Sequence, residues 1–258
     1  MSQVHDRAAV GFDRAGEAYE RGRPGYPPAA LENIVRELGI DPGSVVLDLA
    51  AGTGKLTRSL SGSGARLLAV EPVAGMRDQL AHTTPGVEIL DGTAERIPVP
   101  DGNVDAVVVA QAFHWFEARA ASREIHRVLA PGGGLAVIWN SWDESVPWVA
   151  EMQEIVHEHA GDAPRQAHSS WQRELEASGL FTGFAQTTYP NIVAGDRETV
   201  LARVASTSYI AALDRELHQE VLARVQSRLD AHPQTRDRQR VEMPYTTHLL
   251  TAHRRQAA

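Results

Sequence analysis

The sequence predicts an α/β fold in which a mostly parallel sheet is covered by helices on both faces. Between residues 44 and 140, short apolar runs rich in valine and leucine alternate with segments of helical spacing. This alternation is typical of parallel strands buried between two layers of helices. The chain has 258 residues, 43% of them hydrophobic, which is enough for one large domain with a substantial core.

The elements of the first half follow one another regularly. An opening helix is predicted from Pro27 or Pro28, because apolar residues recur at helical spacing and Gly39 suits the helix end. Short apolar runs then predict strands, and the segments between them predict helices. The predicted strands are VVLDL at 45–49, RLLAVEP at 66–72, GVEIL at 86–90, VDAVVVA at 104–110 and LAVIWN at 135–140. The predicted helices are 54–64, 73–83 and 118–130, the last of them stopped by PGGG at 131–134.

The second half is less regular. A helix is predicted to open at Pro147 with Ser145 as its cap, and SSWQRELEASGLF at 169–181 predicts another helix with a glycine stop. Apolar residues four apart from Leu213 to Leu229 predict an amphipathic helix. The runs FAQTTYPNIV at 184–193 and RVEMPYTTHLLTAHR at 240–254 predict strands.

Composition narrows the class of protein. The formal net charge of -8 disfavours non-specific nucleic-acid binding, which needs a basic face. The absence of cysteine excludes structural disulfides, thiolate zinc sites and a cysteine nucleophile. The N-terminus lacks the apolar stretch of a secretory signal, and no apolar run approaches the roughly 18 residues of a membrane span. We therefore expect a soluble cytoplasmic protein with no membrane partner.

A glycine loop with an acidic residue before it is the main chemical signal. Gly52-Thr53-Gly54-Lys55 follows a predicted strand and precedes a helix, so its backbone amides point into a crevice at the sheet edge. A P-loop is excluded because leucine stands where the motif needs its first glycine and its hydroxyl residue. A dinucleotide fingerprint lacks its third glycine, at Thr57, and would press a pyrophosphate toward Asp48.

The remaining interpretation is a cationic ligand, S-adenosylmethionine. Its amino group and sulfonium are positive, so a carboxylate at Asp48 faces the ammonium group directly or through water. Glu71 ends the second strand, 23 residues after Asp48, where an acidic residue accepts hydrogen bonds from ribose hydroxyls. Glu71 alone suits any adenosine ligand without a 2'-phosphate, and therefore does not separate this donor from NAD.

These motifs together resemble one enzyme family. VLDLAAGTG, AVEP, DGTAERIP, VDAVVVAQAFHWF and REIHRVLAPGGGLAVIWN stand in the order found in class I S-adenosylmethionine-dependent methyltransferases and cover roughly residues 44 to 140. The chain is most similar to the small-molecule branch that includes ubiquinone-biosynthesis and trans-aconitate methyltransferases. YERGRPGYP is similar to the N-terminal cap of this branch. The resemblance implies a Rossmann-like, seven-stranded, mostly parallel sheet with helices on both faces and a helical cap.

The resemblance also implies an organisation and a set of donor-binding residues. A single domain over 1–258 would hold an N-terminal lid and helix at 1–43, a donor-binding core at 44–140, and cap helices with the last strands at 141–258. Two positions depart from the family pattern: Ala50 replaces a glycine, which is tolerable where its φ is negative, and Thr93 replaces an aspartate that binds the adenine amino group. The implied donor-binding residues are Asp48, Ala50, Gly52, Thr53, Gly54, Glu71, Pro72, Met76, Thr93, Ala94, Gln111, Tyr19 and Arg23.

Residues after the fourth and fifth strands are candidates for chemistry and for acceptor binding. His114 in FHWF is a candidate general base, with a pocket-closing role as the alternative. Trp115, Asn140 and Trp142 are candidates for substrate contact. Asp143 is another candidate, or it caps the next helix together with Ser145. No metal is expected, because His157 and His159 are two apart and point to different faces of a helix.

The sequence therefore predicts methyl transfer from S-adenosylmethionine to a small-molecule acceptor by a monomer or homodimer. Two alternatives stay open: an NAD-dependent oxidoreductase, and a protein that binds the donor without transferring its methyl group. The segment before residue 25, with Tyr19, Arg21 and Arg23, is expected to act as a lid whose arginines hold the donor's carboxylate or an anionic substrate.

Overall fold

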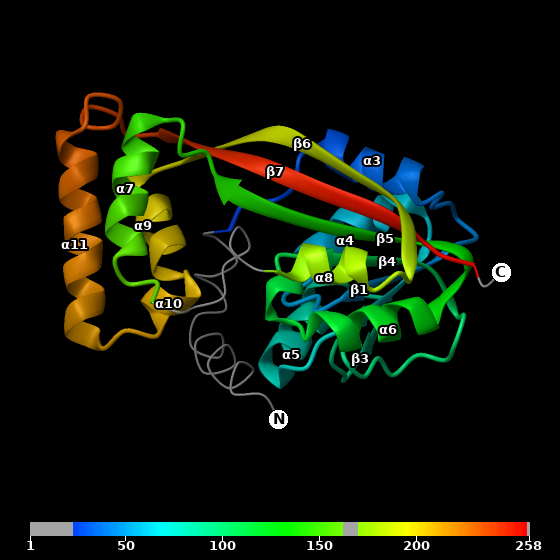
Figure 1. Ribbon diagram of the computed structural model, residues 1–258. Coiled ribbons are helices and arrows are strands. Elements are labelled where there is room, and N and C mark those ends of the chain that lie inside the picture. Colours follow the sequence, from blue (N-terminus) through cyan, green and yellow to red (C-terminus); the bar gives the residue numbers. More distant parts are fainter. Residues whose placement is uncertain (1–22, 162–169, 257–258) are drawn as a thin grey trace. The chain divides into compact units, whose positions relative to one another are not determined.

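The computed structural model describes residues 23–161 and 170–256. Within them lies a seven-stranded sheet of order β3-β2-β1-β4-β5-β7-β6 (Figure 1). Pairs β1–β2, β1–β4, β2–β3 and β4–β5 are parallel. The strands are β1 (Val45–Leu49), β2 (Arg66–Val70), β3 (Glu88–Leu90), β4 (Val104–Ala110), β5 (Leu129–Trp142), β6 (Phe181–Gly195) and β7 (Val241–Arg254). The predicted fold class, a mostly parallel Rossmann-like sheet with helices, is confirmed.

Strand β7 runs against β5. The hydroxyl of Thr247 donates to the side-chain oxygen of Asn140, while the guanidinium of Arg254 donates to the carbonyl of Leu129. Later residues of β7 thus meet earlier residues of β5, which is the order of an antiparallel pair. Strand β7 is therefore an antiparallel strand in a sheet whose pairs β1–β2, β1–β4, β2–β3 and β4–β5 are parallel.

Helices lie between and after the strands. They are α3 (Pro28–Glu37), α4 (Lys55–Leu60), α5 (Ala74–Thr83), α6 (Ala118–Val128), α7 (Pro147–His157), α8 (Trp171–Ala177), α9 (Arg197–Ala205), α10 (Ser208–Ala211) and α11 (Arg215–Ala231), with 3-10 turns η1 (Ser61–Ser63) and η2 (Phe113–Trp115). The sequence interpretation missed α9 and α10, which lack a strong apolar period. None of the helices in the described ranges is long and apolar enough to span a membrane.

Two details differ from the sequence prediction. The PGGG run does not separate α6 from its strand, because β5 already begins at Leu129. A Cβ on Gly133 would lie 2.8 Å from the carbonyl oxygen of Asp105, so glycine permits close strand contact there. Ser145 is not the cap of α7: its hydroxyl donates to Asp143, and Val146 stands at the cap without a side-chain hydrogen bond.

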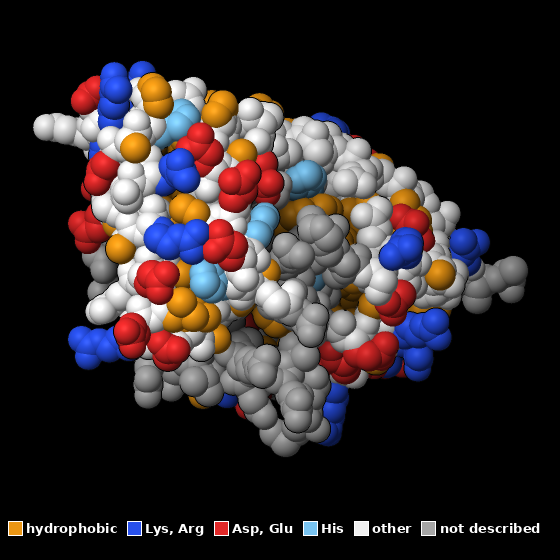
Figure 2. Space-filling model, turned by 60° about the vertical axis from the view of Figure 1, so that its left-hand side comes forward, with side chains coloured by type: hydrophobic (Ala, Val, Ile, Leu, Met, Phe, Trp, Pro, Cys, Tyr) orange, Lys and Arg blue, Asp and Glu red, His pale blue; other side chains and the backbone are white. Residues whose placement is uncertain are grey.

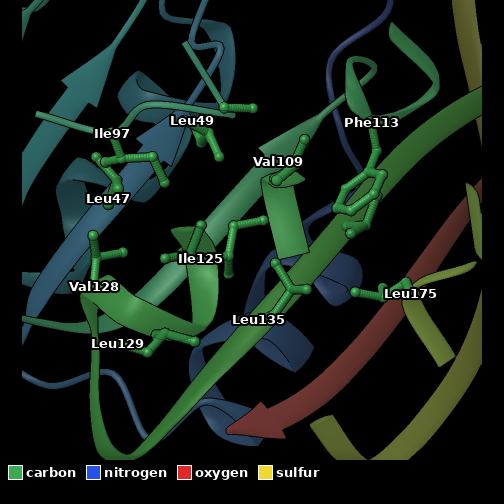
Figure 3. Close-up of a cluster of buried hydrophobic side chains, with 14 of the residues drawn as sticks. Leu47, Leu49, Ile97, Val109, Phe113, Ile125, Val128, Leu129, Leu135 and Leu175 are labelled. Atoms are coloured by element: carbon green, nitrogen blue, oxygen red, sulfur yellow. The ribbon is translucent and has the colours of Figure 1, made fainter. Parts of the chain in front are cut away.

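The chain forms two compact units, each with its own core. Unit 2 comprises 25–140, 164–189 and 247–258, and unit 1 comprises 1–24, 141–163 and 190–246. In unit 2, alternate side chains of the strands bury against α6 and α8 on one face of the sheet, as Figure 3 shows for Val109, Phe113 and Leu175. The other face packs on α3 and α4 through residues such as Ile34 and Leu56. Whether the chain acts as one domain stays a prediction.

Unit 1 is built on helices α7, α9, α10 and α11 with the ends of β5, β6 and β7. Its buried residues, among them Trp148, Met152, Val221 and Tyr245, form one cluster. Acidic and basic side chains are interspersed over the face in Figure 2. Exposed ion pairs of this kind add little to stability, so the unit is held mainly by its apolar core.

Candidate donor-binding and catalytic site

The glycine loop between β1 and α4 is sharply turned. Gly52 and Gly54 have φ angles of 58° and 82°, in the left-handed region that favours glycine. A Cβ on Gly54 would come within 2.3 Å of the Cδ1 atom of Leu80 on α5. Glycine is therefore needed at position 54 for two reasons: the left-handed backbone conformation and the close approach of α5.

Ala50 has a φ of 57°, so the condition under which alanine is readily tolerated at this position, a negative φ, is not met. The chain turns immediately after β1, and the amide of Ala51 donates to the carbonyl of Val70 at 3.1 Å. This bond joins the loop to the end of β2 directly after the left-handed residue. An L-residue costs about 1 kcal/mol there relative to glycine, which explains why a glycine commonly occupies this position.

Asp48 is buried beneath the loop and keeps one oxygen without a partner. Its side chain is 2% exposed, and the hydroxyl of Thr57 on α4 donates to Oδ2 at 2.6 Å. Oδ1 is buried with no hydrogen-bond partner among the residues that the structure describes. Burial raises the pKa of Asp48 to about 7, against the opposing hydrogen bonds from Thr57. The site therefore has an acceptor oxygen whose ionised form a cation would stabilise.

Glu71 links the glycine loop to the start of α5. Its Oε2 accepts the amide of Gly52 and its Oε1 accepts the amide of Val73, each at 2.9 Å. The side chain is only 4% exposed, yet each carboxylate oxygen has a further lone pair. Glu71 is thus held rigidly in a position from which it can accept hydrogen bonds from two neighbouring hydroxyls.

Arg77 supports this arrangement and was missed from the sequence. Its guanidinium donates to the carbonyls of Glu71 and Pro72 at 2.9 and 2.7 Å and forms an ion pair with Asp91. It fixes the turn between β2 and α5. The only sequence signal for it is an arginine one turn into the helix that follows the second strand.

The other predicted donor-binding residues of unit 2 lie along the same edge of the sheet. Thr93 and Arg96 exchange backbone hydrogen bonds just after β3, and Ala94 between them is buried. The sulfur of Met76, on α5, lies 3.9 Å from the position of a Cβ on Gly52. Met76 thus lies beside the loop, while contact of Met76, Thr93 and Ala94 with a donor stays a prediction.

The segment after β4 carries Gln111 and His114. Gln111 has a φ of 57°, and its amide and side chain donate to the carbonyls of Ile138 and Asn140 on β5. His114 lies in η2, half-buried, with its ring 5.0 Å from that of Trp115. Left-handed non-glycine residues are common at functional sites, and Gln111 directs the chain that presents His114.

The candidate substrate-binding residues at the end of β5, Asn140 and Trp142, make contacts with other residues of the protein. Asn140 is buried, donates to the carbonyl of Gly25 at 3.1 Å and accepts from Thr247, so its amide connects segments of unit 2. Trp142 belongs to unit 1 and stacks on Tyr245 at 4.2 Å. Arg23 is also in unit 1, where it lies 3.5 Å from the carbonyl of Ser206. Tyr19 and the proposed lid before residue 23 lie outside the described residues.

The chain is similar to known methyltransferases. A methyltransferase-domain family matches residues 47–137. An uncharacterized methyltransferase of Mycobacterium tuberculosis is 37% identical over 243 residues, which are 93% of each chain. The structure of a putative type II methyltransferase from Anaeromyxobacter dehalogenans has a TM-score of 0.66 at 22% identity and covers 90% of this chain and 97% of its own.

One structural neighbour was solved with the demethylated donor. A phosphoethanolamine N-methyltransferase 2 of Haemonchus contortus, in complex with S-adenosylhomocysteine, has a TM-score of 0.60 at 14% identity and covers 99% of this chain and 61% of its own. At such identity the likeness concerns the fold alone. The sequence relatives decide the family: the chain belongs to the class I S-adenosylmethionine-dependent methyltransferases.

Proposed function

We propose that the protein binds S-adenosylmethionine through Asp48, Glu71 and the glycine loop, and transfers its methyl group to a small-molecule acceptor. The observation that carries this proposal is the buried Oδ1 of Asp48, which has no hydrogen-bond partner in the described chain. Such an orphan acceptor is unfavourable in the protein alone. The ammonium group of the donor fits it, because a cation supplies both a hydrogen bond and a compensating charge.

The neighbouring groups suit the rest of that ligand. Glu71, held by two backbone amides, is placed to accept from ribose hydroxyls, and the positive φ of Gly52 and Gly54 permits the backbone to approach the ligand closely. A dinucleotide pyrophosphate would instead bring negative charge toward Asp48. The site therefore favours the sulfonium donor over NAD.

Bound S-adenosylmethionine supplies an activated methyl group, so much of the protein's task is orientation and exclusion of water. His114 is the residue we propose to accept a proton where the acceptor must lose one. The imidazole ring of His114 is half-buried and lies against Trp115, and both features restrict the orientation of the ring. If the acceptor is a carboxylate, no proton needs to be removed, and His114 would then contribute to acceptor binding only.

Calorimetric titration tests the donor site directly. The wild-type protein should bind S-adenosylhomocysteine and show no heat with NAD, whereas Asp48→Asn and Glu71→Gln should lose roughly 10- to 100-fold in affinity, the scale for hydrogen bonds to charged groups. Asp78→Asn is the matched control, because Asp78 is exposed on α5 and its loss removes the same charge. Binding of NAD, or unchanged affinity in both site variants, would contradict the proposal.

Release of S-adenosylhomocysteine from S-adenosylmethionine in the presence of candidate acceptors then tests for turnover. A panel of small carboxylic acids, phenols and amines should contain compounds that increase the rate of release above the background without an acceptor. A protein that binds the donor tightly but never releases the demethylated product with any acceptor would support the donor-binding alternative instead.

A further inference from the structure

The carbonyl oxygen of Thr53, in the middle of the glycine loop, accepts hydrogen bonds from two helices. Nη1 of Arg58, on α4, donates to this oxygen at 2.6 Å and also donates to the hydroxyl of Thr83 at 2.8 Å. The hydroxyl of Thr83, the last residue of α5, lies 3.1 Å from the same carbonyl and 3.3 Å from that of Leu80, so its one proton is shared between them. We call the group formed by Thr53, Arg58 and Thr83 the Thr53 clamp.

The Thr53 clamp lies directly beneath the loop. Thr53 is 4% exposed, and the side chains of Arg58 and Thr83 are half-buried. A Cβ on Gly54 would lie 3.4 Å from Nη1 of Arg58, so the guanidinium packs against the backbone of the loop. A hydrogen bond from a charged guanidinium is stronger than one between neutral groups. The clamp therefore holds the carbonyl of Thr53 firmly toward α4 and α5.

The loop is thus tied to both ends of α5. Glu71 accepts the amide of Gly52 and the amide of Val73, which stands just before α5. One residue further along the loop, Thr53 is joined to the last residue of the same helix through Thr83. All of these residues belong to unit 2. The two adjacent anchors fix both the amide side and the carbonyl side of the loop.

The loop needs such anchors because its own sequence does not restrict it. Ala50, Gly52 and Gly54 all have positive φ angles, and glycine loses more conformational freedom on ordering than any other residue. A loop that became ordered only on binding would lose affinity by the cost of that ordering, whereas a loop ordered beforehand would not. Contacts behind the loop can therefore raise the affinity for a ligand that they do not touch.

We infer that Arg58 and Thr83 are positioning residues of the donor site, which hold the glycine loop in its binding conformation before S-adenosylmethionine arrives. This inference rests on the proposed donor site and adds two residues that act on the donor through the carbonyl of Thr53. Their role differs from that of Arg77, which fixes the turn between β2 and α5.

Hydrogen exchange of the loop tests whether it is held in advance. The amides of Ala51, Gly52 and Gly54 donate to Val70, Glu71 and Ala51, so they report on the loop's conformation. In the wild type, peptides over residues 50–55 should be protected without ligand and change little with S-adenosylhomocysteine. In Arg58→Gln the loop should exchange roughly tenfold faster without ligand and regain protection when saturated. A wild-type loop that exchanges freely until the ligand binds would overturn the inference.

Calorimetric titration with S-adenosylhomocysteine measures the consequence for affinity. Arg58→Gln should weaken binding by roughly 5- to 30-fold and Thr83→Val by several-fold, whereas Thr83→Ser, which keeps the hydroxyl, should bind like the wild type. Arg66→Gln is the matched control for charge. Arg66 is exposed at the start of β2 and pairs with Glu88, so its loss removes one positive charge and one ion pair away from the clamp. Its affinity should be unchanged, and an equal loss in this control would refute the clamp's role.

Urea denaturation separates positioning from simple support of the fold. Both clamp variants are titrated at temperatures where circular dichroism shows them folded, so a lower stability alone does not lower the measured affinity. With an identified acceptor, they should raise KM for S-adenosylmethionine and leave kcat nearly constant. Reduced stability with unchanged affinity in both Arg58→Gln and Thr83→Val would overturn the inference and leave the proposed donor site intact. Failure of the wild type to bind S-adenosylhomocysteine would instead refute the donor site itself.

Discussion

Replacement of Asp48 by asparagine is expected to stabilise the fold while it weakens donor binding. In the folded chain burial raises the pKa of Asp48 from its usual 3.8 to about 7. The folded state thus binds a proton more tightly than the unfolded state, and stability falls as pH rises from 3.8 toward 7. This rise in the pKa of Asp48 lowers the unfolding free energy by about 4 kcal/mol at pH 8, and about 2.5 kcal/mol of that loss occurs between pH 5 and 8. Asparagine does not ionise and escapes this loss.

The net gain in unfolding free energy from Asp48→Asn is smaller than the electrostatic loss that it avoids, because the amide of asparagine places N–H groups where Oδ1 now lies. An unsatisfied buried group of this kind costs about 1–3 kcal/mol, so we expect Asp48→Asn to gain about 1–3 kcal/mol at pH 8 and to gain nothing or lose stability at pH 5. The hydrogen bond from Thr57 to the remaining oxygen is retained.

Urea denaturation at pH 5 and pH 8 measures this effect for the wild type, Asp48→Asn and the control Asp78→Asn. The difference in unfolding free energy between wild type and Asp48→Asn should change with pH by about 2.5 kcal/mol, since other titrating groups are common to both. A difference that is the same at the two pH values would show that Asp48 does not titrate in a dry site, and would refute this reasoning.

Three further outcomes follow from the site. Ala50→Gly should raise the unfolding free energy by about 1 kcal/mol in urea, since glycine relieves the left-handed conformation; no gain would contradict that conformation. Gly54→Ala should lower stability by about 1–3 kcal/mol, because its Cβ would clash with Leu80. An unchanged stability in the same assay would show that α5 can shift to relieve the clash at no cost. His114→Ala should reduce turnover by roughly 10²–10⁴-fold with donor affinity unchanged if the acceptor loses a proton; unchanged turnover in His114→Ala and His114→Gln would leave the residue a packing role.

Much of the fold was predictable because local signals agreed with one another. The runs that became β1, β2 and β4 are apolar apart from Asp48, Arg66 and Asp105, as is typical of strands covered on both faces, and Gly52 and Gly54 mark the loop that follows β1. Helices α9 and α10 were missed because their packing in unit 1 comes from residues distant in sequence. Such tertiary packing leaves no regular period in a short helix.

The positions of the acidic residues of the candidate site could be predicted from the sequence, whereas the hydrogen bonds that hold the surrounding chain in place could not. Asp48 and Glu71 could be identified because their positions at strand ends are fixed by the order of strand, loop and helix. The brace from Arg77 depends on a turn whose shape no pattern specifies. Asn140 was predicted to contact substrate, yet its side chain is engaged by Gly25 and Thr247, and those residues are remote in sequence.

The pH dependence of donor affinity tests most directly whether Asp48 is the carboxylate that binds the ligand's cation. Between pH 5.5 and 7.5 the ammonium group of S-adenosylhomocysteine stays largely protonated, while Asp48 changes from mostly neutral to mostly ionised around its pKa of about 7. Calorimetry should show affinity rising by nearly tenfold for each pH unit below 7 and levelling above it, with proton release on binding, and the rise should be absent in Asp48→Asn. A wild-type affinity that is independent of pH, with no proton released, would contradict the account.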